Sequence, residues 1–569
     1  MKSFTALALF SLLGLAQPCF AAVQAPYTTQ NGMVASDHYL ASQVGAEILK
    51  KGGNAIDAAI ATSLSLSVIR NQSTGIGGGG FMLIRMHDGR TRVLDYRETA
   101  PAQAHRDMYL NTQGEVIPNL STIGYKAAGV PGLLAGLEAA SKEFGSQPLK
   151  SLFQPAIQIA EKGFASDAHY LEASEVALKR GVNPEFKATY FCNQKPCQIG
   201  ETVKLPQLAK TLKLIADQGI QVFYRGSLAK KIAAAMQANG GLITEADLAQ
   251  YHPKIRSPLK GSYRGYEILT MPPPSSGGTA LLEILNLLEP QELGWNSTGF
   301  GSAEHVMRVT EAMKHAYADR AEFLGDPDFV KVPVEELISK DYALSLLPRI
   351  KAGLKHTLAR EAYGKKGLSY SALQAPIEDH GTTHFSVVDR WGNMVSSTET
   401  INTYFGSLTL VPGTGILLNN QMDDFSSKPG SPNAFGLIGN QANAIAPGKK
   451  PLSSMTPTLV LKAGKPFMSL GASGGPRIIS GTLNTLINVI DFGMNIEEAV
   501  SSPRFHHQWV PDSLFIEKWM PVEVREVLKA HGHHLEITGA ESTVQALLLE
   551  NQQIAGASDP RKGGHPAGY

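Results

Sequence analysis

A threonine that follows a short turn offers the clearest chemistry in this sequence. Gly381 precedes Thr382, and the alternating residues 383–389 that follow predict a strand. Inside the chain, Thr382 is an ordinary residue at the start of a strand. If the Gly381–Thr382 bond is cut, Thr382 carries both a hydroxyl and a free α-amine. That amine titrates near about pH 7.7–8.0 and can act as a base, so the pair can activate a weak hydroxyl nucleophile.

Five motifs elsewhere in the chain contain polar and small residues that could serve this nucleophile. They are residues 95–101, 398–402, 418–425, 451–455 and 471–475. Each motif alone is weak, but their order and spacing are specific. Together they resemble the γ-glutamyltranspeptidases of the N-terminal-nucleophile hydrolase superfamily. The resemblance extends from Ala35 to Arg561, which is nearly the whole mature chain.

The resemblance implies a fold and a maturation step. The fold is of the α+β class, a four-layer αββα sandwich made as one precursor. The precursor cuts itself between Gly381 and Thr382. Residues 23–381 then form a large, mostly helical subunit that contributes strands to the sandwich, and residues 382–569 form the small catalytic subunit of a heterodimer.

The resemblance also implies a role for each residue of the site. Thr382 attacks the γ-carbonyl of glutathione or another γ-glutamyl compound. Water, an amino acid or a dipeptide acceptor then resolves the γ-glutamyl-enzyme, and no cofactor takes part. Thr400 matches a second threonine whose hydroxyl bonds the nucleophile. The other matched residues serve the oxyanion hole (Gly474, Gly475), the substrate α-carboxylate (Arg97, Ser453, Ser454) and the α-amino group (Asn402, Gln421, Asp424).

The chemistry of these residue types agrees with the roles. A γ-glutamyl head group is a zwitterion, so its pocket needs a cation for the carboxylate and an anion for the ammonium. Arg97 offers a forked guanidinium for the first, and Asp424 offers a carboxylate for the second. Consecutive glycines leave backbone N–H groups open to an oxyanion, and losing one such donor costs about 10²–10³ in rate.

One position departs from the family pattern. In many relatives a lid loop carries a tyrosine that hydrogen-bonds the residue equivalent to Asn402. Phe435 stands at the matching position of this chain. Its ring can cover the pocket but cannot make that bond. We therefore expect a lid that opens more readily and admits water better, which favours hydrolysis over transfer.

Three other functions are compatible with parts of the sequence. Residues 471–475 satisfy G-x-S-x-G, so Ser473 could be the nucleophile of a serine hydrolase, with Asp491 and His506 following in order. The mostly helical residues 125–350 argue against the parallel βαβ units of that fold. A cephalosporin or glutaryl acylase of the same superfamily would have no use for the charge of Asp424. A non-enzymatic binder of amino-acid ligands would keep the Gly381–Thr382 bond.

The composition indicates a globular protein. The chain has 569 residues, of which 43% are hydrophobic and 18% charged. This length predicts two domains or one large layered unit. The net charge of +1 gives no electrostatic reason to expect nucleic acid or a membrane surface as a partner.

The N-terminus predicts export. Lys2 precedes the apolar residues 4–15, and small residues follow at Ala21 and Ala22, so residues 1–22 have the layout of a signal peptide. We expect a periplasmic or secreted protein without a membrane span. Cleavage leaves Cys192 and Cys197, a C-x4-C pair that predicts a local disulfide in an oxidising compartment. No metal is expected, since zinc would need two further ligands at suitable spacing.

Hydrophobic periodicity predicts the elements that position the site. Helices are expected within residues 36–69, with a break at Gly52-Gly53-Asn54, and then at 132–144, 205–218, 228–238 and 303–323. Residues 75–80 satisfy G-x-G-x-x-G but follow a helix and lead into a strand. They therefore predict a crowded loop before a hairpin of residues 81–86 and 92–96, not a dinucleotide site.

The character of the chain changes at Thr382. Before it, a strand is predicted at 266–270, and the polar residues 351–378 predict an exposed, loop-like tail. After it, strands dominate, at 383–389, 394–400, 415–418, 456–461 and 466–470, with helices at 476–492 and 521–530. Helices on the outer faces of two packed strand layers would accommodate all of these elements.

Overall fold

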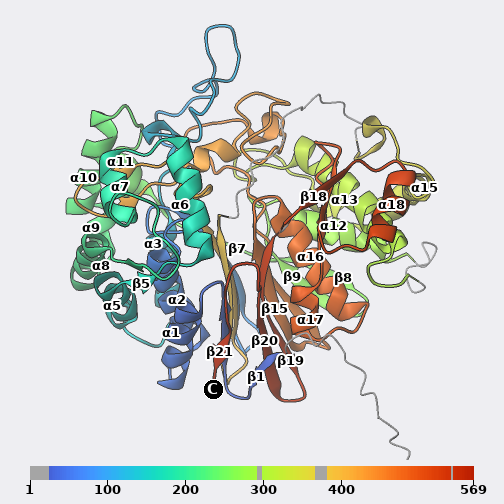
Figure 1. Ribbon diagram of the computed structural model, residues 1–569, viewed down its shortest axis with the longest axis horizontal. Coiled ribbons are helices and arrows are strands. Elements are labelled where there is room, and N and C mark those ends of the chain that lie inside the picture. The colour runs from blue at the N-terminus through green and yellow to red at the C-terminus, as the bar shows by residue number, and fades with distance from the viewer. Residues whose placement is uncertain (1–24, 291–297, 366–380, 540–541) are drawn as a thin grey trace, which may run out of the picture.

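The computed structural model describes residues 25–290, 298–365, 381–539 and 542–569, and within them two antiparallel seven-stranded sheets form the centre (Figure 1). The first sheet contains, in spatial order, β21 (Ala567–Gly568), β2 (Met33–Ser36), β10 (Thr383–Val388), β11 (Met394–Thr400), β3 (Gly79–Arg85), β4 (Thr91–Asp95) and β7 (Lys254–Arg256). The second contains β1 (Tyr27–Thr29), β20 (Gln553–Ser558), β19 (Thr543–Glu550), β15 (Lys465–Ser473), β14 (Thr458–Lys462), β9 (Tyr266–Thr270) and β8 (Leu259–Tyr263).

The two sheets pack against each other through β10 and β11 on one side and β15 and β19 on the other. Alternation along the strands separates two hydrophobic cores, since successive side chains point to opposite faces. On β3, for example, Phe81 and Leu83 join the core of the second sheet, whereas Met82 and Ile84 join the core beneath the helices of the first. The fold is therefore of the mixed α+β class.

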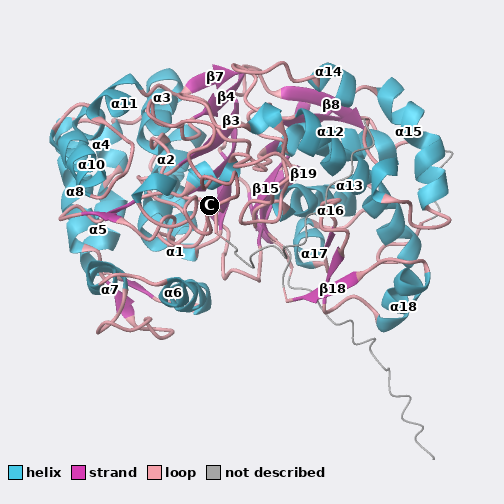
Figure 2. Ribbon diagram, turned by 90° about the horizontal axis from the view of Figure 1, so that it is seen from above, coloured by secondary structure: helices cyan, strands magenta, loops and turns pink. Residues whose placement is uncertain are grey.

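Helices cover the outer side of the first sheet. α1 (Tyr39–Lys50) and α2 (Ala55–Ile69) pack together, and α2 contacts β10 and β11. Asn54 caps α2, because its side chain accepts from the N–H groups of Ile56 and Asp57 while Asp57 bonds back to its N–H. Further helices on this side are α3 (Leu133–Phe144), α4 (Leu149–Leu152), α5 (Gln154–Lys162), α6 (Ala168–Arg180), α7 (Pro184–Tyr190), α8 (Pro206–Gln218), α9 (Gln221–Tyr224), α10 (Ser227–Ala238) and α11 (Glu245–Gln250) (Figures 1 and 2).

A second group of helices lies beside the other sheet (Figure 2). α12 contacts β8, α16 contacts β15, and α17 contacts β20. The bounds of this group are α12 (Gly277–Leu288), α13 (Ala303–Phe323), α14 (Val334–Leu337), α15 (Lys340–Gly353), α16 (Arg477–Ile490), α17 (Ile496–Ser501) and α18 (Val522–Ala530). Smaller pairings join β5 (Phe164–Ala165) to β6 (Thr202–Val203), β12 (Leu410–Val411) to β13 (Ile416–Leu417), and β16 (Phe505–His506) to β17 (Leu514–Glu517) and β18 (Leu535–Thr538).

Most predicted elements are confirmed, including the helix pair broken at Gly52-Gly53-Asn54 and the hairpin of β3 and β4. The predicted loop-like tail is wrong at its start, because α15 continues to Gly353 and buries Ile350 and Gly353. Residues 366–378 of that tail and the predicted signal peptide lie outside the described residues. The short strands β2, β7 and β8 were not predicted.

The glycine loop before β3 is crowded, as predicted. A Cβ at Gly78 would lie 2.2 Å from the carbonyl oxygen of Thr400, and one at Gly77 would lie 2.0 Å from that of Leu417. Only glycine permits such close backbone approach. The loop therefore lies directly against the end of β11.

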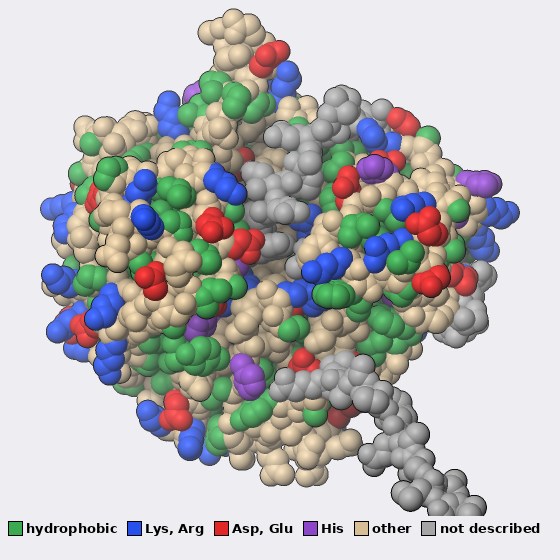
Figure 3. All heavy atoms as spheres, in the orientation of Figure 1, with side chains coloured by type: hydrophobic (Ala, Val, Ile, Leu, Met, Phe, Trp, Pro, Cys, Tyr) green, Lys and Arg blue, Asp and Glu red, His purple; other side chains and the backbone are tan. Residues whose placement is uncertain are grey.

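The described residues include no helix with both the length and the apolar character that a membrane crossing requires. On the face drawn in Figure 3, basic and acidic side chains are interspersed.

Candidate active site

Strand register brings Thr382 and Thr400 together. β10 and β11 form an antiparallel hairpin in which Thr383 lies opposite Glu399, so the preceding Thr382 reaches the end of β11. The Oγ1 atoms of Thr382 and Thr400 are 2.9 Å apart, which is hydrogen-bonding distance. The Thr400 hydroxyl also accepts from the N–H of Asn402 at 2.8 Å. Thr382 is 5% exposed, so this hydroxyl pair is largely shielded from water.

The backbone of Thr382 is strained. Its φ is 75°, a left-handed conformation that a β-branched residue rarely adopts. Its N–H donates to the carbonyl of Ser73 at 3.2 Å, and its carbonyl accepts from Lys562 Nζ at 2.6 Å. Strain of this kind costs about 1–3 kcal/mol and persists where surrounding contacts impose it. Here it is located next to the Gly381–Thr382 bond.

Lys562 and Asp37, which no sequence motif indicated, contact Thr382 and Thr383. Lys562 Nζ lies 3.0 Å from Asp37 Oδ2, and the Thr383 hydroxyl donates to Asp37 Oδ1 at 2.6 Å. A cation held next to Thr382 would lower the pKa of an α-amine on that residue, because two positive charges repel. Lys562 directly follows the C-terminal end of the family resemblance, and only the folded chain places it beside Thr382.

The two charged residues expected to bind a zwitterion form an ion pair. Arg97 Nη2 pairs with Asp424 Oδ2, and Arg97 Nε donates to the carbonyl of Pro451 at 3.2 Å. Gln421 Nε2 donates to the same Asp424 oxygen at 2.7 Å. On the other side of Arg97, Glu98 Oε2 lies 3.9 Å from Nη1. Burial raises the pKa of Glu98 to about 7, against the opposing effect of Arg97.

Ser453 and Ser454 form a serine segment, and Ser453 is hydrogen-bonded to the loop that precedes α12. The N–H of Ser453 donates to the carbonyl of Pro274 at 2.9 Å. The hydroxyl of Ser276 donates to the carbonyl of Ser453 at 2.7 Å. Ser454 is buried beside it and also lines the pocket. The predicted carboxylate-binding serines are thus fixed by backbone contacts to a distant part of the chain.

The glycine pair follows β15 and precedes α16. Gly474 has a φ of 124° and Gly475 a φ of 56°, conformations that favour glycine. A Cβ at Gly475 would lie 2.7 Å from Cδ1 of Phe435, so the ring of the predicted lid residue covers Gly475.

Phe435 is held through its backbone. Its carbonyl accepts from Gln508 Nε2 at 3.1 Å, and the N–H of Ala434 donates to Asp423 Oδ2 at 2.8 Å. Burial raises the pKa of Asp423 to about 6. Asn402, the expected partner of a lid tyrosine, donates instead to the carbonyl of Asn420 at 3.1 Å.

Most of these residues line one pocket. Two predicted residues do not line it: Gly474, which adjoins Gly475, and Gly381, which precedes Thr382. The pocket also includes Arg320 of α13, which the sequence analysis missed. The lining residues are Arg97, Arg320, Thr382, Thr400, Asn402, Gln421, Asp424, Phe435, Leu437, Leu452, Ser453, Ser454, Met455, Gly475, Pro476 and Ile478.

The alternative serine triad does not assemble. Ser473 ends β15 before a helix, as a nucleophile elbow would, but its hydroxyl contacts Thr543 and Lys562. His506 bonds the side chains of Ser480 and Gln508 at 2.9 and 3.0 Å. Asp491 accepts from Tyr263 and Arg264. The bonding partners of these three residues therefore differ from those of a catalytic triad.

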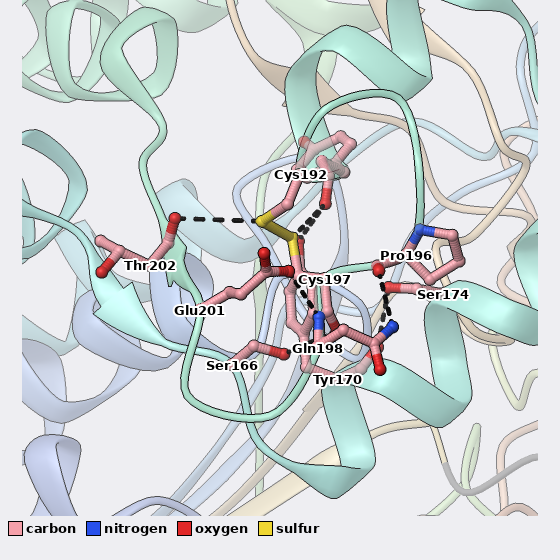
Figure 4. Close-up of a disulfide and its surroundings, with 10 residues drawn as sticks. Ser166, Tyr170, Ser174, Cys192, Pro196, Cys197, Gln198, Glu201 and Thr202 are labelled. Carbon is pink, nitrogen blue, oxygen red and sulfur yellow. Dashed lines mark hydrogen bonds between the residues drawn. A yellow bond between two sulfur atoms is a disulfide. The ribbon is translucent and has the colours of Figure 1, made fainter.

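Cys192 and Cys197 are joined by a disulfide with a Cα–Cα distance of 4.8 Å. The bridge lies in the loop between α7 and β6 (Figure 4). Beside it, the N–H of Gln198 donates to Glu201 Oε2 at 2.7 Å. The disulfide closes a local turn and belongs to the large predicted subunit, away from Thr382 in the sequence.

Known proteins resemble this chain over nearly its whole length. A glutathione hydrolase proenzyme from Escherichia coli strain K12 is 45% identical over 539 residues, which are 94% of this chain and 91% of that protein. A crystal structure of Helicobacter pylori γ-glutamyltranspeptidase has a TM-score of 0.55 at 44% identity, covering 57% of this chain and 93% of that chain. A cephalosporin acylase from Bacillus halodurans has a TM-score of 0.82 at 29% identity, covering 98% and 99%.

The sequence model of the Gamma-glutamyltranspeptidase family matches residues 41–569, which include every residue of the pocket. This chain therefore belongs to the γ-glutamyltranspeptidase family.

Proposed function

We propose that this protein is a γ-glutamyltransferase and glutathione hydrolase whose nucleophile is Thr382. One observation carries the proposal: the Thr382 hydroxyl shares a buried pocket with the oppositely charged side chains of Arg97 and Asp424. A zwitterionic head group bound by these two charges would lie next to the nucleophile.

The nucleophile is made by self-cleavage. Thr382 Oγ1 attacks the carbonyl carbon of Gly381, the peptide C–N bond breaks to leave an ester, and water hydrolyses the ester. Gly381 then ends in a carboxylate and Thr382 begins with an amine. Residues 23–381 become the large subunit and residues 382–569 the small one. The positive φ of Thr382 supports this step, because cleavage releases strain next to the bond that breaks.

Catalysis repeats the same attack on a substrate. The α-amine of Thr382 takes the hydroxyl proton while Oγ1 bonds to the γ-carbonyl carbon. The N–H groups of Gly474 and Gly475 stabilise the resulting oxyanion. The C–N bond then breaks, and the proton passes from the ammonium to the leaving amine. Water or an acceptor amine attacks the ester, again with the α-amine as base, and frees Thr382.

Substrate recognition would be an exchange of ion pairs. Arg97 and Asp424 contact each other in the pocket. A head group would place its carboxylate against Arg97, Ser453 and Ser454, and its ammonium against Asp424, Gln421 and Asn402. One ion pair is then replaced by two, which favours a zwitterion over a substrate with a single charge.

The proposal extends to the fold and the location. The two packed sheets with helices outside each of them support a four-layer αββα sandwich of the N-terminal-nucleophile type. The signal-like residues 1–22 support export to the periplasm or the medium.

An acylase is the second candidate, because the cephalosporin acylase cited above is similar over nearly the whole chain. A glutaryl donor lacks the amino group that Asp424 would bind. We expect γ-glutamyl donors to be turned over at least tenfold more efficiently than glutaryl donors, because a buried hydrogen-bonded charge contributes about 1.5–3 kcal/mol. Equal kcat/KM values for the two donors would favour the acylase.

Electrophoresis and N-terminal sequencing test the central step. Wild type should give two bands, the smaller beginning at Thr382. T382A should give one uncut band and no glutathione breakdown, and T382S should retain part of both reactions because serine keeps the hydroxyl. Cleavage elsewhere, or an active T382A protein, would overturn the proposal.

A further inference from the structure

Arg320 lines the pocket of Thr382, and within the part of the chain that the structure describes no carboxylate forms an ion pair with it. It lies on α13, one turn after Tyr317, whose hydroxyl donates to the carbonyl of Pro476 at 2.6 Å. Arg320 is 5% exposed and lines the pocket together with Asp424 and Ser453. Its Nε donates to Ser276 Oγ at 3.1 Å. Among the described residues, no hydrogen bond or ion pair engages its two terminal nitrogens.

Three other buried arginines of this protein are each paired with a carboxylate. Arg70 pairs with Asp167, Arg97 with Asp424, and Arg504 with Asp559. Burying a cation without a partner is costly. Burial lowers the pKa of Arg320 to about 10, an effect that Tyr317 and Asp424 partly offset, so the side chain is still charged at neutral pH. A charge kept unpaired at the wall of a pocket indicates an anionic ligand.

We propose that Arg320 is a second cation for the α-carboxylate of the γ-glutamyl head group. The hydroxyl of Ser276 accepts from Arg320 and donates to the carbonyl of Ser453, so the guanidinium adjoins the serine segment assigned to that carboxylate. With Nε fixed by Ser276, the two terminal nitrogens form a fork that suits the two oxygens of a carboxylate.

The charges of the pocket explain why a second arginine is needed. Arg97 is already paired with Asp424 and lies 3.9 Å from Glu98. When the ammonium of a bound substrate pairs with Asp424, the charge of the substrate carboxylate must be balanced by the cations around it. Arg320 supplies a charge that forms an ion pair with no carboxylate of the described residues. It would therefore act as a specificity residue that favours donors with an α-carboxylate.

Calorimetric titration tests this role without relying on turnover. The probes are L-glutamate and L-isoglutamine, in which the α-carboxylate is an amide. R320Q is expected to bind L-glutamate about 10- to 100-fold more weakly than wild type, the loss typical of a charged hydrogen bond. Its affinity for L-isoglutamine should change by less than about threefold. KM for a γ-glutamyl anilide should rise more than kcat falls.

The control is R308Q, which removes another buried arginine of α13 that pairs with Glu304 and does not line the pocket. Unchanged glutamate binding by R320Q would overturn the proposal, as would equal losses for both probes, which indicate a structural role. If R320Q does not mature, R320K is the test of the carboxylate-binding role. Lysine keeps the charge but not the forked guanidinium. Wild-type affinity of R320K for L-glutamate would reject the role. Arg320 has this role only if the proposed function holds; a wild-type protein without γ-glutamyl turnover would reject that function instead.

Discussion

Glu98 is a buried carboxylate beside the principal cation of the pocket. Among the described residues, neither of its oxygens has a hydrogen-bond partner. Burial raises its pKa to about 7, whereas Arg97 opposes that shift. The folded protein therefore holds this acid with a pKa above its value of about 4.3 in an unfolded chain.

The raised pKa of Glu98 makes the stability of the folded protein depend on pH. Above pH 7, Glu98 is charged in the folded protein, and the free-energy cost of burying this charge is fully present. As the pH falls through 7, the folded protein takes up a proton and the cost is relieved. E98Q is neutral at every pH, so it should be more stable than wild type at pH 8.5, by roughly 4 kcal/mol at most. The advantage should shrink at pH 5.

Thermal unfolding at the two pH values measures this difference. The control is E523Q, which removes an exposed glutamate of α18 and should give the same Tm difference at both pH values. An E98Q advantage that is equal at pH 5 and pH 8.5 would mean that Glu98 does not titrate in this range.

At the scale of elements, the predicted lid residue Phe435 and its neighbour Ala434 are held through their backbone. Gln508 donates to the Phe435 carbonyl, and Asp423 accepts from the N–H of Ala434. These bonds hold the segment although Phe435 has no hydroxyl to bond Asn402. Whether the predicted lid opens readily therefore depends on how strongly the bond from Gln508 holds the Phe435 backbone.

Two substitutions should move the ratio of hydrolysis to transfer in opposite directions. Q508M removes the donor to Phe435 and should raise the ratio severalfold, since a looser lid admits water. F435Y supplies the hydroxyl that relatives pair with the residue equivalent to Asn402, and it should lower the ratio. Product analysis with glutathione and a dipeptide acceptor gives the ratio. Q441M, at an exposed position, serves as the control; ratios that stay at the wild-type value in both lid variants would refute the hypothesis.

At the scale of the molecule, both sheets mix strands from the two sides of Thr382. β10 and β11 lie between β2 and β3 in the first sheet, and the second sheet places β1 at one edge next to β20, with β9 next to β14. Arg70 adds a link by donating to the backbone carbonyls of Asp37 and Lys562. Cutting one peptide bond leaves all of these contacts in place.

We therefore expect the cut subunits to stay together without a covalent bond. On size-exclusion chromatography at neutral pH, the cut protein should elute at the same volume as uncut T382A, and the subunits should separate only in denaturant. Residues 382–569 expressed alone should not fold, because β10 would lose its pairing with β2, and β11 its pairing with β3. Elution of two separate fragments from native protein would contradict this expectation.

Local pattern in the sequence was enough to determine the longer elements. α13, β9 and β11 have the predicted bounds, because each is long or regular enough for its own periodicity to identify it. The family resemblance likewise identified ten of the residues that line the pocket, from Arg97 to Gly475 and including Phe435.

Only the tertiary structure decided which groups contact one another. The short strands β2 and β7 carry too few residues for a periodic signal, and pairing with strands that are distant in the sequence stabilises them. The ion pair of Arg97 and Asp424, the bond of Arg320 to Ser276 and the contact of Lys562 with Thr382 join residues that are far apart in the chain. Such contacts depend on how the two sheets and their helices pack, and residue types along the chain do not specify that packing.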